Sequence, residues 1–131
     1  MNLNNFKNIG VLFLLIFTTF LCQSCLVSRC ERPQITGYIY DKNTNSPVTN
    51  CKVGEALTNE MGYFNLKEKR YSQFTFFGYE APPIAVNETV FKDGYEKETI
   101  TLYNSFGGGL RKGTIHHADT IYLKKAVNPI P

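Results

Sequence analysis

Beyond residue 33, hydrophobic side chains recur at every second position rather than at helical spacing, and this alternation constrains the fold more than any other feature. Residues 35–40 (ITGYIY) are mostly β-branched or aromatic, and a cluster of turn formers at 41–47 follows them. No segment after residue 25 places apolar residues on one helical face over three turns. The pattern therefore predicts an all-β domain, with its core formed by side chains that include Val48, Val53, Phe64, Leu66, Ile100 and Leu102.

Short extended segments separated by turn formers continue to the end of the chain. Gly62 and Gly94 lie in predicted tight turns, and Pro82-Pro83 interrupts any ladder because proline has no N–H to donate. Residues 104–118 contain four glycines and are predicted as a loop, and residues 126–131 as a flexible tail. Seven strands at intervals of about 8–12 residues favour an antiparallel β-sandwich. They are predicted at 35–40, 48–56, 63–66, 71–79, 84–91, 95–103 and 120–123.

The N-terminus carries a run of fourteen uncharged residues, 9–22 (IGVLFLLIFTTFLC), behind a polar segment that contains Lys7. A helix needs about 20 apolar residues to span a bilayer, so this run is short for a permanent span. It matches the hydrophobic region of a signal peptide, which we therefore expect at residues 1–24. A buried core helix is the alternative, and it is disfavoured because the run has no polar face.

The predicted cleavage site lies between Ser24 and Cys25, with small residues at −1 and −3. A cysteine at +1 resembles the lipobox of bacterial lipoproteins, in which that residue is acylated, for example with palmitate. The lipobox pattern has leucine at −3, whereas here Cys22 occupies that position and Leu21 lies one residue earlier. The resemblance implies lipidation of Cys25, with residues 25–33 as a lipidated tether; simple export and an uncleaved anchor are the alternatives.

The chain has four cysteines, of which Cys30 and Cys51 remain once the signal peptide is removed and lipid occupies Cys25. In an oxidising compartment this pair is a candidate disulfide, and two unpaired thiols are the alternative that spacing leaves open. No Cys-x₂-Cys pair survives in the mature chain, so a zinc site is not expected.

Several segments across residues 34–125 resemble segments of the carboxypeptidase regulatory-like domain and follow one another in the same order. They are 35–41 (ITGYIYD) with 46–53 (SPVTNCKV), then 56–64 (ALTNEMGYF), 91–100 (FKDGYEKETI) and 119–123 (DTIYL). The resemblance implies a transthyretin-like, seven-stranded Greek-key β-sandwich that serves as a non-catalytic module of the bacterial envelope. Cys51 departs from the small residue usual there, and residues 71–89 are longer than the family's middle.

No pattern of catalytic, metal-binding or nucleotide-binding residues stands out. His116 and His117 are adjacent, so on a strand they would point to opposite faces and could share a metal only from a loop. The glycines at 107–109 lack the spacing of a phosphate-binding loop. The net charge is +3, with basic residues scattered among acids, which excludes a nucleic-acid-binding stripe. We expect no enzyme activity, cofactor, metal or nucleic-acid partner.

The aromatic segment 71–79 (YSQFTFFGY) offers a candidate ligand surface at Tyr71, Phe77 and Tyr79, with core packing as the competing interpretation. We expect an envelope lipoprotein that binds or supports an unknown envelope protein or glycan. Leu26 and Val27 carry no acidic retention signal, which favours the outer membrane. The alternative is an exported, soluble carbohydrate- or peptide-binding module without lipid, periplasmic or secreted.

Overall fold

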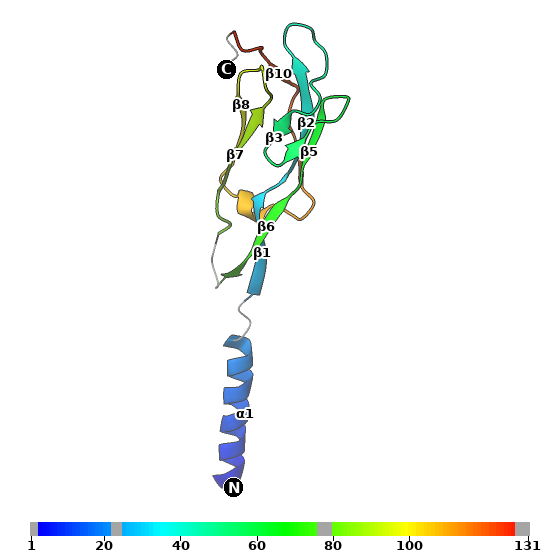
Figure 1. Cartoon of the computed structure of the whole chain (residues 1–131). Coiled ribbons are helices and arrows are strands. Elements are labelled where there is room, and N and C mark those ends of the chain that lie inside the picture. The colour runs from blue at the N-terminus through cyan, green and yellow to red at the C-terminus, as the bar shows by residue number, and fades with distance from the viewer. Residues whose placement is uncertain (1–2, 22–24, 76–79, 128–131) are drawn as a thin grey trace. The chain divides into compact units, whose positions relative to one another are not determined.

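The computed structural model describes residues 3–21, 25–75 and 80–127, and within these the side chains of 9–18 and of residue 26 onward (Figure 1). The described residues are mostly in β structure, preceded by an N-terminal helix. The chain divides into two compact units, one of residues 1–27 with 72–79 and the other of 28–71 with 80–131.

The N-terminal helix, α1 (Leu3–Leu21), contains the uncharged run. All its described side chains are exposed, including those of Phe13 and Leu14. A search of the described segments finds no helix with both the length and the apolar character that crossing a membrane requires. The predicted cleavage region at 22–24 lies outside the described residues.

One four-stranded sheet is built around β2 (Gln34–Asp41), the strand predicted at 35–40. On one side β2 pairs antiparallel with β5 (Tyr63–Leu66). On the other side β9 (Ile115–His117) and β10 (Ile121–Leu123) pair with successive parts of β2, both in parallel. The antiparallel prediction missed these two parallel pairings, and β9 lies within the predicted loop 104–118. Strands of three residues are too short to show an alternating pattern.

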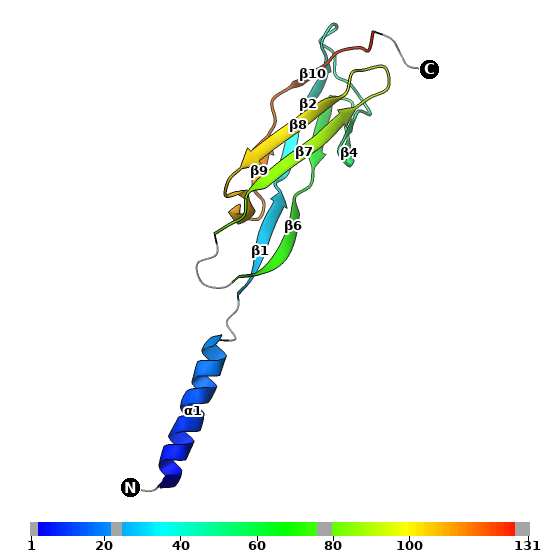
Figure 2. The same cartoon turned by 90° about the vertical axis from the view of Figure 1, so that its left-hand side faces the viewer.

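A second four-stranded sheet is antiparallel throughout, in the order β4-β3-β7-β8. It consists of β3 (Lys52–Val53), β4 (Ala56–Leu57), β7 (Ile84–Phe91) and β8 (Glu98–Asn104), and Figure 2 shows β7 and β8 side by side. The extended segment predicted at 48–56 is broken by a tight turn between β3 and β4. Gly54 makes this turn with φ of 56°, a left-handed conformation that glycine adopts without a steric penalty.

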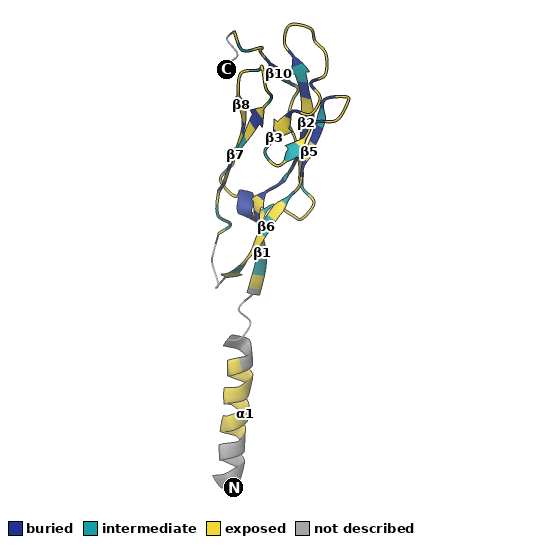
Figure 3. Cartoon of the chain, viewed as in Figure 1, coloured by how far each residue is buried: buried dark blue, intermediate teal, exposed yellow. Residues whose placement is uncertain are grey.

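The hydrophobic core takes residues from both four-stranded sheets (Figure 3). Ile35, Ile39 and Phe64 enter it from the first sheet, and Val53 and Val90 from the second. Of the predicted core residues, all are buried except Leu102, which is partly buried and packs against the cluster. Alternation along the longer strands therefore located the core correctly.

The segment predicted as a tether, 25–33, is instead largely a strand. β1 (Cys25–Arg32) pairs with β6 (Lys69–Thr75) in a two-stranded sheet. Arg29, Cys30, Arg32 and Pro33 are all buried. A sequence with two arginines in four residues predicts a solvated segment, and it is buried here because distant acidic groups compensate Arg32.

The last part of the chain is attached to the domain. The N–H of Ala126, the first residue of the predicted tail, donates a 2.9 Å hydrogen bond to the carbonyl of Gly94. Residues 128–131 of that tail lie outside the described residues, as do residues 76–79 of the strand predicted at 71–79.

Candidate functional site

The predicted lipidation site, Cys25, is the first residue of β1. Its side chain and the whole of residues 22–24 lie outside the described part of the structure. Lipidation of Cys25 therefore stays a prediction from the sequence. Directly after it, Leu26 is 60% exposed.

At the other end of β1, the buried Arg32 is the centre of a charge cluster. Its side chain is 3% exposed, and its guanidinium contacts the carboxylates of Glu55 and Glu88. Nη2 also donates a 2.7 Å hydrogen bond to the carbonyl of Lys67. The hydrogen bonds from Arg32 lower the pKa of Glu55 to about 2. The Glu55 carboxylate is thus held ionised beside the guanidinium, and the cluster attaches β1 to the β3–β4 turn and to β7.

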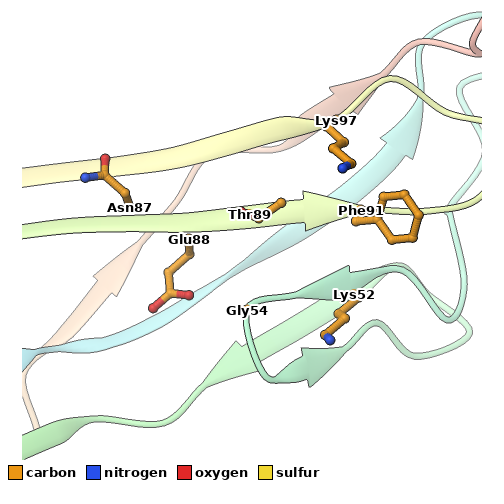
Figure 4. Close-up of a pocket in the computed structure, with 7 residues that line it drawn as sticks. All are labelled: Lys52, Gly54, Asn87, Glu88, Thr89, Phe91 and Lys97. Atoms are coloured by element: carbon orange, nitrogen blue, oxygen red, sulfur yellow. The ribbon is translucent and has the colours of Figure 1, made fainter.

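A groove of about 400 Å³ lies on the second sheet, where Lys52, Asn87, Thr89, Phe91 and Lys97 line it together with Gly54 and Glu88 (Figure 4). Residues on β7 alternate, so that Val86 and Val90 are buried while their neighbours in the groove are exposed. Lys52 on β3 is directly opposite Phe91 in the register. The groove therefore lies on the outer face of the sheet.

The end of the groove around Phe91 is positively charged. The Lys97 ammonium lies 5.4 Å from the centroid of the Phe91 ring, and the side chain of Phe91 remains 38% exposed. In the described part of the chain, neither Lys52 nor Lys97 forms an ion pair with a carboxylate. Glu88, the acid in the groove, is already paired with Arg32. This arrangement can bind an anion next to an aromatic ring.

Of the predicted ligand surface, Tyr71 is on β6 and is 42% exposed, whereas Phe77 and Tyr79 lie outside the described residues. The structure therefore places only one member of that surface. The sequence analysis did not predict the groove. The sequence signal was Phe91, an aromatic residue at an outward position of an alternating strand.

Tyrosines form a second exposed aromatic surface, on the first sheet. Tyr38 pairs with Tyr63 at a ring-centroid distance of 5.3 Å, and Tyr40 pairs with Tyr122 at 6.4 Å. Both pairs join residues directly opposite each other in neighbouring strands. Cross-strand aromatic pairs stabilise a sheet, which accounts for their position.

The two histidines are on β9 rather than in the loop from which they could share a metal. His116 is opposite Ile35, and His117 is opposite Thr36, with Nδ1 of His117 3.0 Å from the Thr36 hydroxyl. Adjacent residues on a strand point to opposite faces. Over the described ranges, no three His, Cys, Asp or Glu side chains gather closely enough to hold a metal ion.

Cys30 and Cys51 are both buried free thiols, so the candidate disulfide is not formed in this structure. The sulfur of Cys51 lies 3.4 Å from the carbonyl oxygen of Phe91, whereas the charged neighbours of Cys30 are Arg70, Glu68 and Glu31. Burial is the main cause that raises the pKa of each thiol.

A scan against models of known protein families finds no match to this chain, and a search of the curated proteins finds no significant relative. The resemblance to the carboxypeptidase regulatory-like domain is therefore carried by the sequence segments alone. Function has to be inferred from the N-terminal sequence, the two sheets and the groove.

Proposed function

We propose that this protein is a non-catalytic lipoprotein of the bacterial envelope, anchored by acyl chains on Cys25 and presenting one β-domain to a partner. The observation that carries the proposal is the position of Cys25. It follows Ser24 and a run of fourteen uncharged residues, 9–22. Two or more acyl chains suffice for stable membrane attachment, which one chain does not provide.

The distribution of buried residues supports removal of the N-terminal segment. Within the described residues, the core cluster contains none from α1. All the described side chains of α1 are exposed. Cleavage before Cys25 would therefore leave that cluster complete, as a signal peptide requires.

For the domain itself we propose the transthyretin-like Greek-key β-sandwich of the carboxypeptidase regulatory-like family. The support is a core shared by two four-stranded sheets, with Ile35 and Phe64 from one and Val53 and Val90 from the other. Burying one face of each sheet against the other is the usual way for two sheets to form a core. The outer faces then remain available for a partner.

The anchor is tested by expressing the full chain in a Gram-negative host and measuring the intact mass of the membrane-associated product. We expect a mass equal to residues 25–131 plus the acyl groups. Cys25→Ser should lose the acyl mass and the membrane association. Cys22→Ser, the matched control, removes a neighbouring thiol from the segment to be cleaved and should leave the product unchanged.

The opposite result would be an unmodified wild-type product that begins at Cys25 and fractionates with the periplasm. That outcome would overturn the lipid anchor and would favour a soluble, exported binding module. A product that retains residues 1–24 would instead show an uncleaved anchor.

A further inference from the structure

We propose that the groove on the outer face of β3, β7 and β8 binds a carboxylate-bearing saccharide, with the sugar ring on Phe91 and the carboxylate between Lys52 and Lys97. The proposal goes beyond the anchored lipoprotein because it names the ligand class of the presented domain. It does not depend on the lipid at Cys25.

The first reason is the position of Phe91. Its side chain is on the solvent side of β7 and is 38% exposed, whereas the preceding residue, Val90, is fully buried. Lys52 is directly opposite it on β3, and Lys97 is near its ring from the segment that precedes β8 (Figure 4). An aromatic ring between two flexible side chains gives the apolar face of a sugar ring a surface to stack on.

The second reason is the unbalanced charge. The described part of the chain supplies no carboxylate partner for Lys52 or Lys97. Glu88, farther along the groove, is bound to Arg32 and does not compensate either lysine. Charge complementarity therefore favours a ligand with its negative group at the Phe91 end.

The third reason is that the groove also has neutral polar side chains, besides Glu88. Asn87 and Thr89 are exposed on the same side of β7 as Phe91, and Asn87 accepts a 3.2 Å hydrogen bond from the Thr101 hydroxyl. Amide and hydroxyl groups are suitable partners for sugar hydroxyls. The volume of about 400 Å³ lies within the range typical of small-ligand sites.

A peptide strand is a poorer fit to this site. β7 pairs with β3 on one side and with β8 on the other. Around Val90, beside Phe91, β7 therefore has a strand on each edge, and a peptide cannot add there as another strand. A ligand at this face has to bind through side chains, as a saccharide does.

The test uses the full-chain product purified from the host in mild detergent, titrated with trigalacturonate and with its fully methyl-esterified form by calorimetry. The two probes share the same rings and differ in charge. We expect binding of the acid form and at least about tenfold weaker binding of the ester, because the ester lacks the carboxylates that Lys52 and Lys97 would contact.

The variants separate the site from general attraction to a basic protein. Lys52→Gln with Lys97→Gln should weaken binding by at least tenfold, whereas the control Lys42→Gln with Lys67→Gln removes the same charge elsewhere and should not. Phe91→Leu should also weaken binding, and Phe91→Tyr should preserve it because the aromatic face is retained. The melting temperature of each variant confirms that it is folded.

Equal binding of the acid and ester forms, or no binding of either, would overturn the proposal. So would an equal loss in the two double-lysine variants, or a loss on Tyr38→Ala with none on Phe91→Leu, which would place the site on the other sheet. The intact mass of the same sample reports lipidation separately. Failure of saccharide binding and failure of the lipid anchor can therefore be told apart.

Discussion

The hydrophobic core and the two-stranded sheet of β1 and β6, called the ribbon below, are stabilised in different ways. In the core, Ile35, Val53 and Phe64 are at most 1% exposed and pack through apolar contacts. Along the ribbon, arginine side chains stabilise the structure through polar contacts. Arg32 contacts two carboxylates, and Arg70 donates to the Ser28 hydroxyl and carbonyl, at 2.8 and 2.9 Å.

The two regions therefore depend on their sequences in different ways. Apolar packing is non-directional, so a core side chain needs only the right face and about the right volume. A buried arginine needs particular partners at hydrogen-bond distance, because an unpaired buried charge is strongly destabilising. The ribbon should therefore depend on individual partners, whereas the core should respond to volume.

The largest effect should come from the core. Phe64→Ala should lower the free energy of unfolding by about 4 kcal/mol, because it removes a fully buried aromatic side chain and leaves a cavity. Phe74→Ala is the matched control, since Phe74 on β6 is 66% exposed. Urea denaturation of the full chain measures both. Similar losses for the two variants would contradict the division between core and ribbon.

The next largest effect should come from Arg32→Leu. We expect a loss of about 3 kcal/mol, because the substitution leaves Glu88, with its side chain 18% exposed, without its cation. Adding Glu88→Gln should restore part of the loss, which a double-mutant cycle in urea quantifies. If the two losses simply add, the ribbon depends on arginine packing rather than on charge pairing.

A smaller effect separates backbone conformation from packing. Gly62 has φ of 74°, and a Cβ there would collide with the carbonyl oxygen of Ile39, whereas Gly94 has φ of 81° and open space around it. Gly94→Ala should lower the free energy of unfolding by about 1 kcal/mol, because it adds only the strain of a left-handed alanine. Gly62→Ala should lower the free energy of unfolding by about 1 kcal/mol more than Gly94→Ala, because the collision adds to the same strain. Equal costs in thermal unfolding would show that the turn at Gly62 relaxes.

The same contrast explains how much of the molecule the sequence predicts. Alternation located β2, β5, β7 and β8 and their buried residues, because it is a local signal. β1 was missed because its burial depends on Glu88, which is 56 residues from Arg32 in the chain.

The groove was missed for a similar reason. Lys52, Phe91 and Lys97 come from separate segments and meet only through the pairing of β3, β7 and β8. The two parallel pairings of β2 likewise follow from the path of the chain and not from any local pattern.

Asp41 combines both kinds of interaction and gives an effect that depends on pH. Its carboxylate accepts hydrogen bonds from the N–H groups of Thr44 and Asn43, as a turn former should, but also from the distant Tyr95 hydroxyl at 2.8 Å. The bond from Thr44, followed by that from Tyr95, lowers the pKa of Asp41 from 3.8 to about 2.

A lowered pKa in the folded state means that Asp41 stabilises the fold above about pH 4 and that this contribution is lost as the pH falls toward 2. Asp41→Asn should therefore be less stable than the wild type at pH 7, and the gap should close between about pH 4 and pH 2. Urea midpoints across that range measure it. A constant gap would show that Asp41 acts through its shape rather than its charge. Tyr95→Phe should lose only the distant hydrogen bond, so its loss of stability at pH 7 should be smaller than that of Asp41→Asn.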